Sequence, residues 1–425
     1  MIEAEFTLLL LTLLVGVMIV AALLLKGVSE KLGLPAIVAY LLLGIGLQAI
    51  DRAHHLQTES AQSVLNFLAE LGLICLLFRV GLESNLSGLR RQLPRASVIL
   101  VGDLLFSGLL GFGLAFYGLH WPLVTSLVVS LALIATSVGI SINVWQEAKA
   151  LSSPTGELLL DIAEMDDIAA IALMSLLFAL LPFIQEAAAP GASLPSAIVS
   201  ATALGDASHI LFTTLAAFCL RVGLFTTLCL GFSRYAERPL IRLFEALEPA
   251  PDPMLTVAGI GFITAAIAGF LGFSVAVGAF FAGLVFSRDP EAVTFDASFG
   301  TLSELFVPFF FINIGLGLNL QAVSQTATLG LVISLVAIAG KLIGVGITAG
   351  NTVSPCSAVL LSLSMMPRAE ITMVVLQKGQ SLGDGVIPPV VFGAMVTMTL
   401  VTCSITPLCL RPLLRRWRPY LELTS

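Results

Sequence analysis

Long apolar runs recur along the whole chain, and they limit its possible folds more than any other sequence feature. The first run, residues 6–25, has the length of a membrane-spanning helix, about 20 residues. Only 11% of the 425 residues are charged and 57% are hydrophobic, whereas a soluble domain has about 25% charged residues. The surplus apolar surface must face lipid, because a soluble chain of this composition could not cover itself with polar groups. The composition therefore excludes a secreted protein, a nucleic-acid-binding protein and a cytosolic enzyme.

Glycine, proline and charged residues divide the apolar runs and predict an all-α, multi-pass membrane protein with about thirteen helices. Two of these helices are short for a bilayer, 35–50 and 272–287, so we expect them to pack away from lipid or to share residues with their neighbours. Acidic Glu3 and Glu5 precede the first helix, where a cleaved signal peptide would be basic, so this helix is expected to be retained. The expected helices are 6–25, 35–50, 64–82, 96–118, 122–145, 155–182, 205–233, 253–270, 272–287, 298–318, 327–349, 355–378 and 385–410.

The distribution of Lys and Arg predicts how the chain is oriented. When successive connections are assigned to opposite sides, fourteen of the twenty basic residues fall on one side. The other side receives two, Arg52 and Lys378, and four lie within helices. Because basic loops stay in the cytoplasm, the N-terminus is expected outside and the C-terminus inside, in the inner or plasma membrane of a cell.

Thirteen helices divide into two sets of six that flank one linker helix. Residues 6–182 would form the first set, 205–233 the linker and 253–410 the second set, followed by a short cytoplasmic tail at 411–425. An odd number of crossings before the second set turns it over in the membrane. The two sets are therefore expected to form an inverted repeat, as in many secondary transporters.

Polar or helix-breaking residues interrupt the fifth helix of each set. Residues 135–139, with the sequence ATSVG, lie halfway along helix 122–145, and residues 366–368, MPR, lie halfway along helix 355–378. Unwound backbone inside a bilayer is tolerated only where it lines a cavity or is buried in protein. Two kinked helices with packing residues would also explain the pattern. Matched positions in both sets favour a crossed, discontinuous pair of helices that forms an ion site near the bilayer centre.

The most informative residues are two adjacent acids, Asp166 and Asp167, in the middle of helix 155–182. With Pro154 in the first turn, Asp166 lies about 18 Å along the helix axis, close to the bilayer centre. Carboxylates at that depth cost several kcal/mol unless they are paired or protonated, and such residues are functional by default. Adjacent side chains point about 100° apart, so one acid can face a water-filled cavity while the other pairs inside the protein. The alternative is a hydrogen-bonded structural pair, although stabilisation would not require both acids.

Lys341 is the expected partner of the acid pair. It lies eight residues from the cytoplasmic end of helix 327–349, at a depth comparable with that of the acids. Gly340 and Gly344 on either side allow another helix to approach closely. The alternative is that the ammonium group reaches back to the cytoplasmic interface.

Other charged residues in the membrane have expected supporting roles. Arg368 and Glu370, next to the break at Pro367, would neutralise the dipoles of the broken helix first and contact the ion second. Glu164 would line the cytoplasmic entrance or pair with a nearby basic residue. Most of the remaining intramembrane charges, Asp103 among them, are expected to be structural.

Missing motifs narrow the class of transporter. The chain has no GxxxxGK[ST], HExxH or GxSxG sequence, so nothing supports ATP hydrolysis or other enzymatic chemistry. The four histidines map to the external side, and the six cysteines lie in apolar runs without metal-binding spacing. We therefore expect a transporter driven by an ion gradient, with no enzymatic activity, no cofactor and no nucleic-acid partner.

Several motifs together resemble the monovalent cation:proton antiporter family, second branch, and within it the NapA-type sodium/proton antiporters. The resemblance extends over essentially the whole chain. It implies the crossed-helix (NhaA/NapA-like) fold and a homodimer in which a core domain moves against a dimerisation domain. The motifs are Glu70-Leu71-Gly72, Phe78-Arg79-Val80-Gly81-Leu82-Glu83, Ala135-Thr136-Ser137-Val138-Gly139, Asp166-Asp167, Lys341 and Pro367-Arg368-Ala369-Glu370.

The resemblance also implies roles for individual residues. Asp167 would bind the proton and the cation, Na⁺, and Asp166 would form a switching salt bridge with Lys341. The unwound Thr136 and Ser137 would offer oxygen atoms to the ion. The implied activity is electrogenic exchange of cytoplasmic Na⁺ or Li⁺ for external protons by alternating access. Roughly two protons would cross per cation, because several coupled groups titrate together.

Two residues depart from the family pattern. Arg79 stands where the family usually has an apolar residue, and Glu164 adds an acid where an aliphatic residue is expected, so pH dependence or ion preference could differ. The related KefC-like potassium exporters usually have Gln-Asp instead of Asp166-Asp167 and carry a cytoplasmic nucleotide-binding domain, so both features point away from them.

Three alternatives to sodium/proton exchange remain open. Potassium/proton exchange is the second hypothesis, because the same residues would suit it. A cation channel is the third, although the chain has no filter sequence such as TVGYG. An anion carrier is disfavoured, because an acid pair at the bilayer centre repels anions.

Overall fold

The structure is a computed structural model of the chain. It describes residues 2–54, 59–83, 93–187, 253–270, 275–286, 292–317, 320–383 and 385–421, with isolated residues between 216 and 239. These residues form helices, and no strand occurs among them. The predicted linker helix at 205–233 lies almost entirely outside the described residues, and so does the connection before it.

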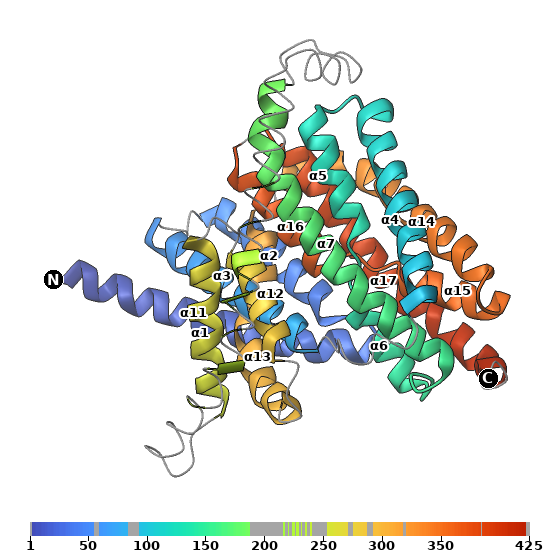
Figure 1. Cartoon of the computed structure of the whole chain (residues 1–425). Helices are drawn as coiled ribbons and strands as arrows, with labels where there is room; N and C mark the ends of the chain where they lie inside the picture. The colour runs from blue at the N-terminus through green and yellow to red at the C-terminus, as the bar shows by residue number, and fades with distance from the viewer. Residues whose placement is uncertain are drawn as a thin grey trace.

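Each of the other predicted helices is present, and Figure 1 shows their arrangement. Six segments of the described chain are long and apolar enough to cross a membrane. The prediction of an all-α, multi-pass membrane protein is therefore confirmed. The first half contains α1 (Ile2–Lys31), α2 (Ala36–His54), α3 (Glu59–Glu83), α4 (Leu93–Phe112), α5 (Leu123–Ile134), α6 (Val138–Glu147) and α7 (Pro154–Ala187). The second half contains α11 (Pro253–Phe270), α12 (Val275–Phe286), α13 (Ala292–Leu316), α14 (Leu320–Gly350), α15 (Pro355–Ser364), α16 (Glu370–Ser381) and α17 (Pro389–Leu421).

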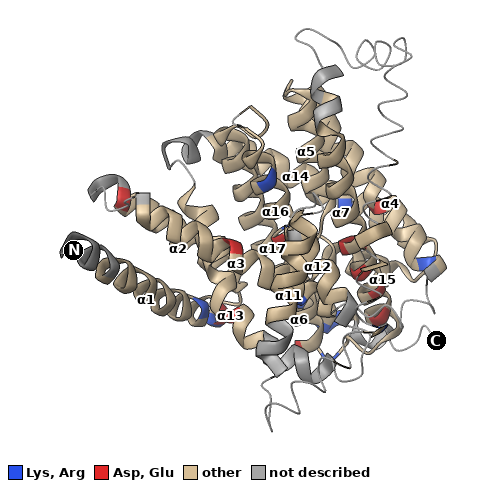
Figure 2. Cartoon of the chain, turned by 60° about the vertical axis from the view of Figure 1, so that its left-hand side comes forward, with Lys and Arg blue, Asp and Glu red and all other residues tan. Residues whose placement is uncertain are grey.

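Apolar side chains cover the outside of the helix bundle. Leu13 and Leu24 of α1 are 63% and 66% exposed, and Leu109 of α4 is 67% exposed. Figure 2 shows that charged residues are sparse along the described helices. Exposed apolar surface of this extent is unfavourable in water and favourable in a bilayer.

The last helix is longer than the sequence predicts. It was expected to end at residue 410 and to be followed by a tail at 411–425, but α17 continues to Leu421. Leu410 and Leu414 are fully buried, and Arg411 is hydrogen-bonded to two other segments. These contacts hold the additional turns against the protein, which explains why the helix does not end at the last apolar run.

The helices pack into two groups. In Figure 1, α1–α3 and α11–α13 lie together on the left, whereas α4–α7 and α14–α17 occupy the centre and right. Within the first group α3 packs on α12 and α13, and within the second α14 packs on α4 and α17. Backbone contacts between the groups are sparser and include those of α2 with α14 and α17. We refer to these sets as the first group and the second group.

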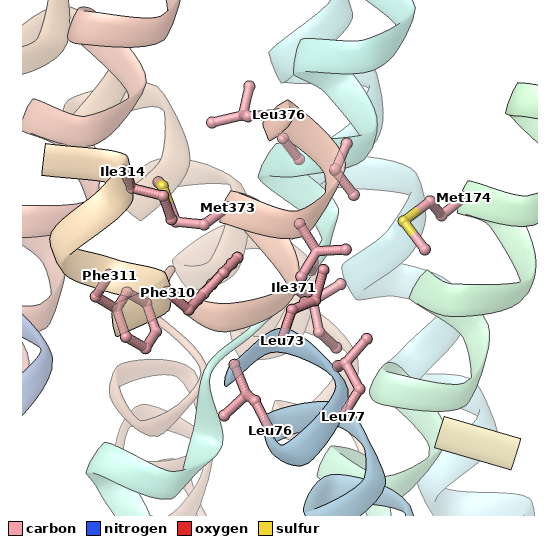
Figure 3. Close-up of a cluster of buried hydrophobic side chains, with 14 of the residues drawn as sticks. Leu73, Leu76, Leu77, Met174, Phe310, Phe311, Ile314, Ile371, Met373 and Leu376 are labelled. Carbon is pink, nitrogen blue, oxygen red and sulfur yellow. The ribbon is translucent and has the colours of Figure 1, made fainter. Parts of the chain in front are cut away.

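Apolar side chains fill the boundary between the two groups. Figure 3 shows Leu73 and Leu77 of α3 and Phe310 of α13 near Ile371 and Met373 of α16. All five side chains are buried. Apolar contacts are non-directional, so such a boundary can slide without breaking specific hydrogen bonds.

Two pairs of glycines bring helices of the first group very close together. A Cβ atom on Gly81 of α3 or on Gly283 of α12 would lie 2.1 Å from a carbonyl oxygen of the other helix. A Cβ on Gly44 of α2 or Gly315 of α13 would lie 2.2 or 2.5 Å from such an oxygen. Side chains larger than hydrogen do not fit at these crossings. The short helix predicted at 272–287 is thereby packed inside the protein, as expected.

Candidate ion-binding site

Two non-helical segments interrupt helices of the second group. Between α5 and α6 the backbone is extended, with ψ of 136° at Ala135 and 85° at Ser137. Between α15 and α16 the segment includes Pro367 and ends at Ala369, which has φ of −141° and ψ of −90°. The backbone N–H of Ser137 donates to the carbonyl oxygen of Pro367 at 2.9 Å, so the two segments meet. Both predicted helix breaks are confirmed.

The local sequence explains both interruptions. Pro367 has no N–H group to donate, and its ring disfavours a helical conformation at Met366. Thr136 and Ser137 have short polar side chains that compete with the backbone for hydrogen bonds and therefore favour helix ends. The interruptions leave carbonyl and N–H groups that need other partners inside the membrane.

Side chains of each broken helix bind carbonyl groups near the end of the other. The hydroxyl of Ser141 on α6 donates to the carbonyl oxygen of Ser364 on α15 at 2.6 Å. The hydroxyl of Thr372 on α16 donates to the carbonyl oxygen of Ala132 on α5 at 2.9 Å. These two bonds correspond to each other when the two halves of the chain are exchanged.

Charged groups lie at the ends of the broken helices. The ammonium group of Lys341 donates to the last carbonyl oxygen of α5 at 2.9 Å, and the guanidinium group of Arg368 donates to Met365 at the end of α15 at 3.0 Å. Glu370 begins α16, and its carboxylate accepts a hydrogen bond from the Ser137 hydroxyl. Each charge opposes the partial charge of the helix end that it faces. The positions of Arg368 and Glu370 thus suit their predicted supporting role.

Asp166 lies beside the first interruption. It is fully buried on α7, and its Oδ2 atom accepts a hydrogen bond from the backbone N–H of Thr136 at 3.0 Å. Within the described part of the chain, neither its Oδ1 atom nor the Thr136 hydroxyl has a hydrogen-bond partner. Asp167, the next residue, is partly exposed. Oxygen atoms without donors, next to an extended backbone segment, suit a small hard cation.

The predicted salt bridge between Asp166 and Lys341 is not formed, because Lys341 pairs with Asp103 instead. Both partners are fully buried, Lys341 on α14 and Asp103 on α4. Gly340 and Gly344 bring α14 against α4, which places the carboxylate of Asp103 next to the lysine. Sequence reasoning missed this role of Asp103. The available signal was its position well inside an apolar helix, where an acid needs a partner.

Most of the predicted site residues come together at the crossing. Glu164 and Asp167 lie on α7 within one turn of Asp166, and both are partly exposed. The charged residues that are buried in the described part of the chain are two acids and two bases, Asp103, Asp166, Lys341 and Arg368. The predicted residues in direct contact with the broken helices are Thr136, Ser137, Asp166, Lys341, Pro367, Arg368 and Glu370.

A polar cavity of about 380 Å³ lies between the two groups, at one end of the bundle. It is formed by the ends of α2, α13 and α16 and the beginnings of α3 and α17. The Oε1 atom of Gln377 is buried there without a hydrogen-bond partner among the described residues. The polar residues that line the cavity are Gln48, Asp51, Gln62, Asn66, Asn313, Gln377 and Gln380.

Arg411 connects the two groups at the opposite end of the bundle. Its Nε and Nη2 atoms donate to the two carboxylate oxygens of Glu147 at 3.1 and 3.3 Å. Its Nη1 atom donates to the carbonyl oxygen of Gly33, between α1 and α2, at 3.1 Å. Arg411 and Glu147 belong to the second group and Gly33 to the first. The groups are therefore joined at this end and separated by a cavity at the other.

Buried charges at the crossing of two broken membrane helices are the features of a protein that carries ions across a bilayer. The fold and the site thus define an integral membrane ion transporter with multiple spans. More particularly, the chain belongs to the sodium/hydrogen exchanger family, whose transmembrane model matches residues 18–416. This is a family of transporters, not of enzymes.

Several named cation transporters are similar in sequence to most of this chain. The high-affinity Na⁺/H⁺ antiporter NhaS3 of Synechocystis sp. is 27% identical over 86% of this chain and 76% of its own length. The Na⁺/H⁺ antiporter of Enterococcus hirae is 26% identical over 90% of this chain and 93% of its own length. The glutathione-regulated potassium-efflux system protein KefC of Salmonella arizonae is 29% identical over 70% of this chain, but over only 44% of its own length.

A solved structure has the same fold. The sodium proton antiporter MjNhaP1 from Methanocaldococcus jannaschii matches with a TM-score of 0.68 over 98% of both chains. Only 18% of the residues are identical, so this likeness concerns the fold. The predicted class of crossed-helix antiporter folds is confirmed.

Proposed function

We propose that the protein exchanges Na⁺ or Li⁺ for protons at Asp166 and Asp167. The observation that carries the proposal is the buried Oδ1 atom of Asp166, which has no donor among the described residues and lies on the helix beside the extended Thr136 segment. A carboxylate in this position needs a counter-charge, and a monovalent cation or a proton can supply it. The relatives from Synechocystis and Enterococcus hirae, which are Na⁺/H⁺ antiporters, support this choice of ions.

Competition between the ions would couple their movements. Asp167 binds the Na⁺ ion or a proton together with Asp166, and Thr136 and Ser137 supply further oxygen atoms. Glu164 lines the cytoplasmic entrance to the site. Either ion neutralises the acids, which lowers the cost of carrying the site through the membrane. An acid pair without a bound ion stays charged, so movement of the empty site through the membrane is suppressed.

The second group, which contains the whole site, would move against the first group by alternating access. The apolar boundary in Figure 3 supports such sliding because its contacts are non-directional. Cytoplasmic Na⁺ then leaves as external protons enter. The exchange is electrogenic, with more protons than cations moved per cycle. The first group would hold two copies together as a homodimer.

The two halves, 6–182 and 253–410, are proposed to be inverted repeats. The glycine crossings support this, because exchange of the halves turns the α3–α12 contact into the α13–α2 contact. Helices α4 and α14 would exchange with each other, and they pack together. The two reciprocal hydroxyl-to-carbonyl bonds at the broken helices fit the same relation.

The cavity and the Arg411 contact would define an outward-facing state. With the N-terminus outside, the ends of α2, α13 and α16 lie on the external side, so the cavity opens outward. The contact of Arg411 with Gly33 then closes the cytoplasmic side. Ion access from the cytoplasm would require this contact to break.

Replacement of Arg411 by alanine is expected to shift the protein toward the inward-facing state. The contact that joins the two groups is the hydrogen bond from Arg411 to the carbonyl oxygen of Gly33, worth about 1 kcal/mol, which corresponds to about a five-fold change in the ratio of states. With Asn66→Cys introduced in the wall of the cavity, the thiol would then react more slowly with an impermeant maleimide applied from outside. Arg415→Ala, one turn further along the same helix, should leave the rate unchanged. Equal rates in both variants would contradict a gating role for Arg411.

Potassium/proton exchange is the second candidate function. It is favoured by the similarity to the potassium-efflux protein KefC. The adjacent acids Asp166 and Asp167 would accommodate either cation, and selectivity depends on the size and flexibility of the oxygen cage.

Cation-dependent proton flux in proteoliposomes tests both functions. An imposed Na⁺ or Li⁺ gradient is expected to move protons in the opposite direction and to change the membrane potential. Replacing Na⁺ by K⁺ should reduce the flux strongly, and an equal or larger flux with K⁺ would select the second candidate. A proton flux without any change in potential would contradict electrogenic exchange. Protein that moves no protons with any of these cations would refute the proposed function.

A further inference from the structure

The buried pair formed by Lys341 and Asp103 is separate from the acid pair on α7. Lys341 donates to the carboxylate of Asp103 and, at 2.9 Å, to the carbonyl oxygen of Ile134. The hydroxyl of Ser107 donates to the other carboxylate oxygen of Asp103 at 3.1 Å. Both oxygen atoms of Asp103 are thus engaged, and the lysine is held at the end of α5.

Close packing of α4 against α14 fixes this pair in place. A Cβ on Gly344 would lie 3.0 Å from the Cα of Asp103, and a Cβ on Gly340 would lie 3.0 Å from the Cα of Ser107. Glycine at both positions lets the backbones of α4 and α14 approach closely. The carboxylate of Asp103 and the ammonium group of Lys341 therefore meet without either side chain having to extend along its helix axis. Both helices belong to the second group, so the pair travels with the site.

Two buried acids exert their charge on Lys341. The negative charges of Asp103 and Asp166 both act on Lys341, but the hydrogen bond is made to Asp103. The Oδ1 atom of Asp166 has no donor among the described residues. A lysine bound to Asp166 would place its positive charge where the cation has to bind.

We propose that Asp103 is a positioning residue that holds Lys341 away from Asp166 and thereby sets the affinity of the site for its cation. The inference rests on the proposed exchange at Asp166 and Asp167, and it adds a residue that does not itself contact the ion. In this arrangement Asp103 acts through the lysine alone. Removing the Asp103 charge frees the ammonium group to compete with the cation.

The test compares Asp103→Asn with the double variant Asp103→Asn/Lys341→Gln. Cation affinity is read from the rise in melting temperature of the purified protein as NaCl is added, since a ligand that binds the folded state stabilises it. Choline chloride at equal ionic strength is the control. Asp103→Asn should weaken the affinity for Na⁺ about ten-fold, because the freed lysine occupies Asp166 for most of the time. The double variant lacks this competitor and should bind Na⁺ at least as tightly as the unmodified protein.

Flux measurements provide a second readout. In Asp103→Asn the KM for Na⁺ should rise while the maximal rate stays within about two-fold. Ser107→Ala, which removes one hydrogen bond from Asp103, should raise the KM by a smaller factor in the same direction. A structural role alone would lower the melting temperature without salt and leave the affinity unchanged.

Two outcomes would overturn the inference. One is an unchanged Na⁺ affinity in Asp103→Asn, and the other is a double variant that binds as weakly as Asp103→Asn. If Asp103→Asn does not fold, the double variant decides alone, because it removes both charges of the Lys341–Asp103 pair: weaker binding than in the unmodified protein refutes the proposal. Failure of the unmodified protein to exchange cations for protons would instead refute the proposed function, whatever the Na⁺ affinity of the variants.

Discussion

Asp167→Asn is expected to abolish Na⁺-driven proton movement, with a loss of at least about 100-fold. An asparagine side chain has nearly the same shape as aspartate, but it neither carries a negative charge nor binds and releases a proton. The buried site would then lack the group for which the two ions compete. The measurement is the initial rate of proton movement in proteoliposomes under a fixed Na⁺ gradient.

Matched variants on the same helix separate the loss of the site from a loss of folding. Asp161→Asn, about one and a half turns before Asp167 on α7, should retain the rate within about two-fold, because it lies outside the crossing. Asp166→Asn keeps an oxygen that can accept the Thr136 N–H, so it should fold and yet transport poorly. Full Na⁺-driven proton movement in Asp167→Asn would place the ion site elsewhere.

Gly81→Ala is expected to lower the free energy of unfolding by about 3 kcal/mol. The added methyl group would lie 2.1 Å from the carbonyl oxygen of Phe280, and backbone cannot rotate away as a side chain can. Helices α3 and α12 would have to separate along their whole contact. Gly283→Ala, on the other side of the crossing, should have a similar effect.

The control for the glycine variants is Gly16→Ala on α1, where no atom lies within 4 Å of the added Cβ. Alanine favours a helix over glycine by about 1 kcal/mol, so this variant should be neutral or slightly stabilised. The melting temperature of the purified protein and its elution as a single folded species measure the difference. Equal melting temperatures for Gly81→Ala and Gly16→Ala would show that the close crossing is not required.

The sequence predicted the broken helices well because their cause is local. Pro367 removes a donor, and Thr136 and Ser137 compete with the backbone, so the interruptions are visible in a few adjacent residues. The start of α7 at Pro154 was likewise visible in the sequence, and it fixes the position of Asp166 along the helix. Features that depend on a single segment were therefore accessible without a structure.

The partner of Lys341 was predicted incorrectly because the prediction compared only how deep each residue lies in the membrane. Asp166 and Lys341 were matched by their distance along the membrane normal, which says nothing about which helix faces meet. The contact of α4 with α14 brings Asp103 to the lysine, and that contact depends on packing of helices far apart in sequence. Such information is absent from the pattern of a single helix.

The end of α17 was also missed because it depends on contacts between segments far apart in sequence. Its apolar run ends near residue 410, but buried Leu414 and the contacts of Arg411 continue the helix beyond it. The sequence shows three more arginines after Arg411, which are typical of a cytoplasmic border and give no sign of tertiary contacts. Helix ends set by tertiary contacts are therefore missed, whereas ends set by proline or glycine are found.

With the N-terminus outside, as proposed, the lining of the cavity between the two groups would have a consequence for how acidity outside the cell is sensed. Amide side chains carry no net charge and exchange no protons at physiological pH, and they supply most of the polar groups around this space. Among the described residues of its wall, Asp51 is the single carboxylic acid, and no histidine occurs there. The mouth would therefore attract cations almost equally in mildly acid and alkaline surroundings. The response to external pH would then depend on Asp166 and Asp167. The same carboxylates would both respond to the external proton concentration and bind the proton that is transported.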